Sequence, residues 1–326
     1  MQAATRREDL QIKGEQAMTT QLDEKTVRSF AAVRSRASER ALKRVGIVVA
    51  DDEVALAAAA DALRLRIAQP VLIGDAERIR ALAAKLGLHD LLANAPLTGA
   101  ADAAETAVRM ARAGELDILL KGHLRTDQLL RAVLDKEKGL RTGRLLSDIA
   151  FFEFAQEGRT RLVGISDGGI TPAPTLEQKI QIVQNAVEAF HKLGTQRPKM
   201  AIMSATEVVS EGIVSTTDAR KLTEMCAAGA FGHADVFGPL ALDNALLKWA
   251  AKAKGIEHPV AGEADCLIVP NIEAGNLLGK AIKFIAGLPF GHVIVGARVP
   301  ILIPSRVESA EDKVNAIALG VLCAER

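Results

Sequence analysis

A serine and an arginine stand between an apolar run and a helix, where an anion could bind. Ser305 and Arg306 follow the run Ile301-Leu302-Ile303-Pro304. The spacing of apolar residues predicts a helix over Ala310–Ala324 with one apolar face. The first turn of a helix has free N–H groups and a partial positive charge, and a neighbouring guanidinium adds a full one. The segment therefore predicts a site for phosphate or for an oxyanion that develops during a reaction.

The same segment also has an interpretation that needs no chemistry. Ser309 and Asp312 are spaced as the N-cap and third residue of a capping box, which satisfies the backbone at the start of a helix. The spacing alone favours this structural interpretation for Asp312. For Arg306, an anion site and a salt bridge explain the residue equally well.

Two further loops after expected strands carry polar side chains. One holds Asn271, Gly275 and Asn276, where the amides could bind a ligand and the glycine would let it approach. Capping of the following helix explains the asparagines nearly as well. The other loop begins at Lys121, and Arg131 belongs to the run of basic residues after it. This local excess of positive charge suits a polyphosphate ligand, although a solvated helix face is the default for such a run.

The segment Gly164-Ile165-Ser166-Asp167-Gly168 matches the G-x-S-x-G pattern of serine hydrolases. In those enzymes the chain turns directly from the serine into a helix. Here residues 169–174, with two prolines, come before a helix expected from Thr175, where Thr175 and Gln178 are spaced as a capping box. We therefore do not expect Ser166 to be a nucleophile. We expect a loop of small residues in which Ser166 and Gly168 contact a ligand.

The elements that position these residues alternate regularly from Arg44 onward. Strands are expected over Val45–Ala50, Pro70–Asp75, Asp117–Leu120, Arg161–Ser166, Lys199–Ser204, Asp265–Val269, His292–Val295 and Ile301–Ile303. Helices are expected over 53–69, 76–86, Ala103–Ala113, Thr126–Glu137, Thr175–Leu193, Thr217–Ala228, Leu240–Lys254, Ala274–Ala286 and Ala310–Ala324. This alternation predicts an α/β fold with a parallel sheet, whose sites gather beyond the carboxyl ends of strands.

The composition disfavours several functions. The chain has 326 residues, with 41 Lys and Arg against 40 Asp and Glu, one Trp, nine Phe and no Tyr. A net charge near zero gives little basis for binding nucleic acid or an acidic membrane surface, and so few aromatic residues leave little for bases to stack on. No apolar run would cross a bilayer, no signal peptide is evident, and the cysteines and histidines have no metal-ligand spacing. We expect a cytoplasmic protein of two domains with no metal site, and a flexible tail over residues 1–21.

Several segments, taken in order, resemble the phosphate acetyltransferase/phosphate butyryltransferase family. The most specific are Lys136–Thr142, Gly238–Asp243, Pro270–Asn276, and Ser305-Arg306 followed by Glu311-Asp312. The resemblance covers nearly everything from Arg44 to the C-terminus. It implies two α/β/α domains with parallel-rich sheets around a cleft, as in isocitrate and isopropylmalate dehydrogenases, and a homodimer. It also implies that the C-terminal strand and helix return to the first domain, which places the domains at 22–145 plus 293–326 and at 146–292.

The reaction that this resemblance implies is the reversible conversion of acyl-CoA and inorganic phosphate to acyl phosphate and free CoA. Thiolate attack on an acyl phosphate needs a base for the thiol and positive charge for the oxyanion and the departing phosphate. By resemblance Asp312 is the base, Arg306 and Ser305 bind phosphate and stabilise the transition state, and Arg131 contacts substrate. Coenzyme A is then a substrate, and no tightly bound cofactor is expected.

The acyl group is open between acetyl and butyryl. Glu273 and the segment Val295–Pro300 look like the butyryl branch, whereas Asp148 stands where that branch often has histidine. One methylene in an apolar pocket changes binding by only about 1–3 kcal/mol, so both acyl groups fit this reading.

Three other functions are open at this point. They are an NAD(P)- and metal-dependent dehydrogenase of the same fold, a serine hydrolase acting through Ser166, and a non-catalytic protein that binds CoA or acyl phosphate. No G-x-G-x-x-G follows the first strand, which leaves the dehydrogenase without local support. The presence of Ser305, Arg306 and Asp312 together argues against a protein that only binds.

Overall fold

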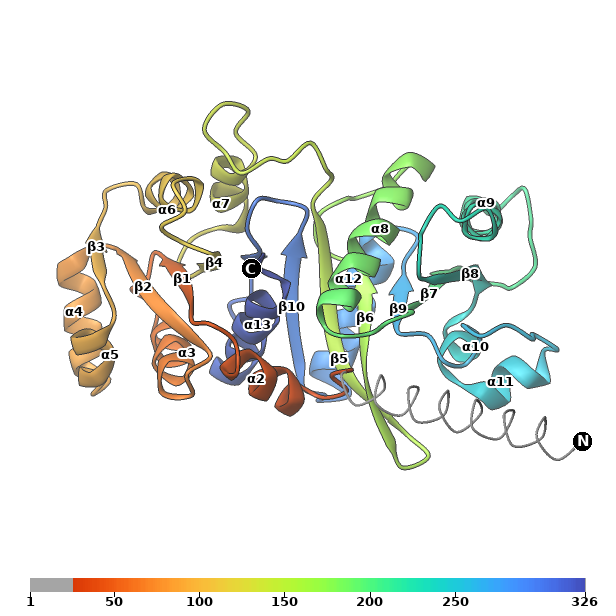
Figure 1. Cartoon of the computed structure of the whole chain (residues 1–326), viewed down its shortest axis with the longest axis horizontal. Helices are drawn as coiled ribbons and strands as arrows, with labels where there is room; N and C mark the ends of the chain where they lie inside the picture. Colours follow the sequence, from red (N-terminus) through yellow and green to blue (C-terminus); the bar gives the residue numbers. More distant parts are fainter. Residues whose placement is uncertain (1–25, 326) are drawn as a thin grey trace, which may run out of the picture.

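One continuous sheet of eleven strands runs through the molecule, in the order β3-β2-β1-β4-β11-β10-β5-β6-β9-β7-β8 (Figure 1). The computed structural model describes residues 26–325, and the tail expected over residues 1–21 lies outside them. The strands are β1 (Lys43–Val48), β2 (Ala68–Gly74), β3 (Leu97–Gly99), β4 (Ile118–Lys121), β5 (Ser147–Gln156), β6 (Arg159–Ser166), β7 (Lys199–Met203), β8 (Asp235–Leu240), β9 (Cys266–Ile268), β10 (Phe290–Val295) and β11 (Ile301–Leu302).

Helices connect and cover these strands. They are α2 (Phe30–Ser38), α3 (Glu53–Arg64), α4 (Ala76–Lys85), α5 (His89–Asn94), α6 (Ala103–Arg112), α7 (Thr126–Val133), α8 (Leu176–Lys192), α9 (Val214–Ala227), α10 (Leu242–Leu246), α11 (Lys248–Ala253), α12 (Ile272–Lys280), the π-helical turn η1 (Ala281–Ile285) and α13 (Ala310–Cys323). Among residues 26–325, no helix has the length and apolarity that crossing a membrane requires.

The α/β class expected from the sequence is confirmed, but the sheet is mixed rather than parallel throughout. The pairs on either side of the centre are parallel. In the centre, β10 is antiparallel to both β11 and β5, and β5 is antiparallel to β6. β5 and β6 form a hairpin whose turn residues, Glu157 and Gly158, both have positive φ (51° and 75°). Such a turn matches the twist of two antiparallel strands.

The antiparallel centre brings two sets of loops together. Because three antiparallel pairs separate them, β11 and β6 run in opposite directions. Ile301 and Asp148 both pair with Ile294, while Ala150 pairs with Ile165. The two strands therefore end at the same height in the sheet. Residues after β11 and residues after β6 can then lie on opposite sides of one cavity over β10 and β5.

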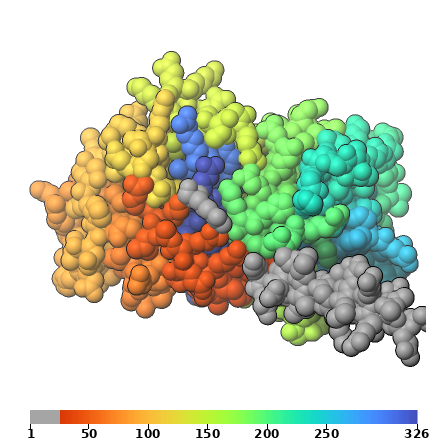
Figure 2. Space-filling view, in the orientation of Figure 1, coloured from red at the N-terminus to blue at the C-terminus, as the bar shows by residue number. Residues whose placement is uncertain are grey.

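The C-terminal helix α13 lies in the middle of the molecule, between the part formed by β1–β4 and the part formed by β6–β9 (Figure 1). It packs against β10, α2 and α3, and every residue from Asp312 to Cys323 is buried. The single apolar face expected for this helix is thus wrong, because the helix has neighbours on all sides. Figure 2 shows C-terminal residues reaching the surface between the two parts of the chain.

β11 pairs with β4, so the C-terminal segment adjoins the strands of the first expected domain. Hydrogen bonds nevertheless continue from strand to strand across the whole sheet. The domain boundaries at residues 145/146 and 292/293 stay a prediction.

Candidate active site

A cavity of about 490 Å³ lies over the central strands, between the loops that follow β4, β11, β6 and β9. Five of the nine residues proposed from the sequence line it: Gly168, Gly275, Asn276, Ser305 and Arg306. They come from three segments that are far apart in the sequence. Their gathering in loops that follow β6, β9 and β11 agrees with the expectation that functional residues lie beyond the ends of strands.

Ser305 and Arg306 form a turn between β11 and α13. The backbone N–H of Glu308 donates to the carbonyl of Ser305 at 3.2 Å, and Nζ of Lys313 donates to the same carbonyl at 3.4 Å. The Arg306 side chain is exposed and makes no salt bridge to another residue within 26–325. Its guanidinium is therefore available to an anion in the cavity, which favours the first of the two interpretations that the sequence left open.

Two buried lysines, Lys121 and Lys313, stand next to this turn. The sequence pointed only to Lys121, as the first residue of a basic loop. Lys121, at the end of β4, lines the cavity and is only 5% exposed. Its Nζ has one long hydrogen bond, 3.4 Å to the carbonyl of Leu124. Burial lowers the pKa of Lys121, and the positive charges of Lys313 and Arg306 lower it further. An ammonium with so few partners beside Arg306 is suited to an anion with several oxygens.

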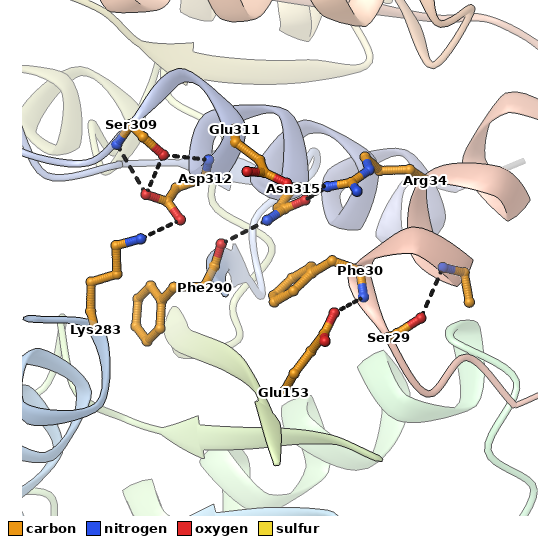
Figure 3. A network of polar contacts seen from close by, with 11 residues as sticks. Ser29, Phe30, Arg34, Glu153, Lys283, Phe290, Ser309, Glu311, Asp312 and Asn315 are labelled. Carbon is orange, nitrogen blue, oxygen red and sulfur yellow. Dashed lines mark hydrogen bonds and ion pairs between the residues drawn. The ribbon is translucent and has the colours of Figure 1, made fainter. Parts of the chain in front are cut away.

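Asp312 has a structural role of the kind that its spacing predicted (Figure 3). Its Oδ2 accepts hydrogen bonds from the N–H and Oγ of Ser309, at 3.0 and 2.7 Å, which forms the capping box of α13. Its Oδ1 accepts from Nζ of Lys283 at 2.7 Å. The carboxylate is buried and does not line the cavity, whereas Lys283 does. Asp312 thus holds a cavity-lining cation in place.

The glycines of the cavity wall pack against each other. A Cβ added to Gly275 would lie 2.7 Å from the Cα of Gly168, closer than real contacts allow. The close approach expected at Gly275 is therefore found, and it is to the backbone of the loop after β6. Asn276 lines the cavity, while Asn271 caps α12 by accepting from the N–H of Ala274 at 3.0 Å.

Two other proposed residues lie outside the cavity lining. Ser166 is fully buried, and its Oγ has no hydrogen-bond partner among the described residues. The helix after it, α8, begins only at Leu176, where Thr175 and Gln178 form the capping box that the sequence predicted. Ser166 is thus not placed as a nucleophile would be, and no neighbouring base among the described residues is hydrogen-bonded to its hydroxyl. Arg131 is exposed on α7.

The floor of the cavity holds a buried acid–imidazole–acid trio, Asp148, His292 and Glu308. His292 is not among the residues proposed from the sequence, and no strand was expected around Asp148. An apolar run over residues 149–154 with three phenylalanines, interrupted by Glu153 and followed by Glu157-Gly158, was the available signal for that strand. Within the part of the chain described, no group of three His, Cys, Asp or Glu residues could hold a metal ion.

The remaining lining is largely apolar. Ala150, Phe290 and Ile294 project from β5 and β10, and Ile303 and Phe284 complete this side. The cavity therefore joins a cationic end, formed by Lys121, Lys283 and Arg306, to an apolar surface. Such a site can hold an anionic group and a short hydrocarbon group of the same substrate.

Comparison with known proteins agrees with this arrangement. Residues 92–321 match the family model described as phosphate acetyl/butaryl transferase. A phosphate butyryltransferase of Clostridium acetobutylicum is 38% identical over 91% of this chain and 99% of its own. A phosphate acetyltransferase of Thermotoga maritima is 36% identical over 86% of this chain and 95% of its own. A solved structure of a branched-chain phosphotransacylase from Enterococcus faecalis V583 superposes with a TM-score of 0.76 at 29% identity, covering 86% of this chain and 99% of that one.

These relatives are acyltransferases, which favours transfer of an acyl group over the dehydrogenase considered from the sequence. The match of the family model covers more than half of the chain and includes the strands, loops and helix that form the cavity. The chain belongs to the phosphate acetyl/butyryl transferase family.

Proposed function

We propose that this protein is a phosphate acyltransferase that interconverts acyl-CoA plus inorganic phosphate with acyl phosphate plus free CoA. The observation that carries the proposal is that Arg306, which makes no salt bridge within residues 26–325, and Lys121, whose ammonium has one long hydrogen bond there, line the same cavity. Two cations of this kind, beside the hydroxyl of Ser305, suit an anion with three or more oxygens. CoA is a substrate in this reaction.

The transfer step follows from this arrangement. In the direction of acyl-CoA synthesis, the CoA sulfur attacks the acyl carbonyl carbon, the carbonyl oxygen becomes negative, and the C–O bond to phosphate then breaks. Arg306, Ser305 and Lys121 stabilise the negative charge on the oxygens of the departing phosphate. In the reverse direction they hold inorganic phosphate while one of its oxygens attacks the thioester carbonyl.

The thiol proton needs an acceptor, and Asp312 is the proposed base. A carboxylate is a weak base for a thiol of pKa near 8.5, and both oxygens of Asp312 already accept hydrogen bonds. Asp312 therefore has a second proposed role, in which it orients the ammonium of Lys283 toward the cavity. A cation at that place would stabilise the thiolate.

Asp312→Asn separates a catalytic role of this carboxylate from its structural role in the cap of α13. We expect the free energy of unfolding to fall by about 1–3 kcal/mol, because the amide group cannot accept from both Ser309 and Lys283. If the carboxylate is the base, kcat falls about 100-fold in addition. Ser309→Ala is the matched control, since it weakens the cap but leaves the Asp312–Lys283 ion pair. Thermal unfolding and kcat of the folded fraction measure the two effects; a destabilised Asp312→Asn variant with full kcat would leave Asp312 a structural residue only.

The finer features of the function are proposals as well. The apolar side of the cavity suits acetyl and butyryl groups alike, and Asn276, Gly168 and the exposed Arg131 are proposed to contact CoA or substrate. Asn271, Gly275 and Ser166 are proposed to act by shaping the loops that contact substrate. A homodimer and a location in the cytoplasm stay predictions.

A thiol-release assay tests the proposed function. Acetyl-CoA, butyryl-CoA and isobutyryl-CoA are each incubated with the protein, with and without phosphate, and free CoA is measured. We expect release that depends on phosphate, with an acyl phosphate as the second product. Release without phosphate would indicate a hydrolase, and calorimetric binding of acyl-CoA without release would indicate a protein that only binds.

A further inference from the structure

His292 connects two loops that line opposite sides of the cavity. Its Nδ1 lies 3.1 Å from Oδ1 of Asp148, and its Nε2 lies 3.6 Å from Oε2 of Glu308. His292, Asp148 and Glu308 are 9%, 9% and 7% exposed. The imidazole is therefore enclosed between two carboxylates, one on β5 and one in the turn that carries Ser305 and Arg306.

Each carboxylate belongs to one wall of the cavity. Glu308 lies three residues after Ser305, and its N–H donates to the Ser305 carbonyl. On the other side, the N–H of Asp148 donates to Oδ1 of Asp167 at 3.3 Å. Asp167 in turn accepts hydrogen bonds from the backbone of residues 169–171, which form the loop after β6. A single side chain on β10 thus reaches both walls.

The charges of this trio depend on the imidazole. Burial alone would lower the pKa of His292, but the carboxylates of Asp148 and Glu308 raise it to about 10. A protonated imidazole donates a hydrogen bond to Asp148, forms an ion pair with Glu308 at 3.6 Å, and leaves the trio with one net negative charge. Without the imidazolium, two buried carboxylates would face each other beside a site proposed for phosphate, and they would repel each other and the phosphate.

We propose that His292 is a positioning residue for phosphate binding: its positive charge holds Glu308, and with it the Ser305–Arg306 turn, against Asp148. This inference rests on the proposed function. His292 does not touch the reacting atoms, because its Nε2 is buried, makes no hydrogen bond within residues 26–325 and faces the carboxylate of Glu308 at 3.6 Å. It acts through the turn that does.

The test is a set of three variants. For His292→Gln we expect the KM for phosphate to rise about tenfold, because Asp148 and Glu308 are then unbalanced, and the KM for acyl-CoA to change much less. In His292→Gln combined with Glu308→Gln the charge balance is restored, and we expect the KM for phosphate to return most of the way. The control is His89→Gln, at an exposed position on α5.

A merely structural histidine would give a different pattern. Its loss would lower stability and would change the KM for phosphate and the KM for acyl-CoA to the same extent. Adding Glu308→Gln would then not restore phosphate binding. Either result would overturn the proposal. Absence of activity in the unaltered protein would instead contradict the proposed function.

A second measurement does not need activity or a folded variant. In protein labelled with ¹⁵N-histidine, we expect one imidazole to keep both ring protons at about pH 8.5, where free histidine is neutral. The charged groups that face it are Asp148 on β5 and Glu308 on the turn. If all imidazoles are neutral at that pH, His292 carries no charge and the proposal is wrong.

Discussion

Arg306→Ala should lower kcat/KM for phosphate about 1000-fold, the largest loss that we expect from a single substitution. The guanidinium is exposed and makes no salt bridge to another residue of the described chain, so it contributes little to the fold. We therefore expect the free energy of unfolding to change by less than about 0.5 kcal/mol. Phosphate-dependent CoA release and thermal unfolding measure the two quantities on the same samples.

Two comparison variants make the result specific. Arg306→Lys keeps the charge but loses the planar pair of donors, so we expect it to recover only part of the lost activity. Arg197→Ala removes another exposed arginine, which pairs with Asp235 at 2.7 Å away from the cavity, and it should retain full activity. Near-normal turnover by Arg306→Ala would show that phosphate does not bind at the Ser305–Arg306 turn.

The sequence predicted the elements that have a strong apolar period and clear end signals. α8 was predicted with its capping box at Thr175, and α13 with its box at Ser309. The ends of several helices differ from the prediction. The helix expected over Leu240–Lys254 is two helices, because Leu247 between them is extended. The helix expected over Ala274–Ala286 begins at Ile272 and ends as the π-helical turn η1.

The missed strands have local sequences that argue against strand structure. β8 contains Gly238-Pro239, and proline cannot donate to a sheet ladder. The structure tolerates it because β8 is an edge strand that pairs only with β7. β5 carries Asp148 and Glu153 in a buried run, which weakens its apolar pattern. The antiparallel centre of the sheet was missed with β5, since alternating strands and helices predict parallel pairs alone.

The candidate site was predictable where local motifs exist and not where contacts are long-range. Ser305 and Arg306 stand out because a strand and a helix flank them within a few residues. Lys121 and His292 have no such context. Lys121 lies near Arg306 and Lys313, and His292 is hydrogen-bonded to Asp148, in each case more than a hundred residues away in the chain. Only the register of β10 with β5 and β11 brings Asp148 and Glu308 to the two sides of one imidazole.

Lys121→Met should reduce activity without reducing stability. The residue is 5% exposed, and the one hydrogen bond of its ammonium within residues 26–325, to the Leu124 carbonyl, is 3.4 Å long. Because burial and the charges of Lys313 and Arg306 lower the pKa of this lysine, the charge is costly when no anion is bound. Methionine has a similar length and no charge, so we expect the free energy of unfolding to stay equal or rise. We expect kcat/KM for phosphate to fall about 100-fold.

Lys179 provides the matched control. It is also 5% exposed, but its Nζ forms an ion pair with Asp218 at 2.8 Å between α8 and α9. Lys179→Met leaves that carboxylate buried and unpaired, so we expect it to lose about 3–5 kcal/mol of stability while the folded fraction keeps its kcat. Loss of activity at Lys121 and loss of stability at Lys179, two equally buried lysines, would distinguish a lysine that binds substrate from one that stabilises the fold. If Lys121→Met instead unfolded like Lys179→Met and kept its activity when folded, the anion site would not include Lys121.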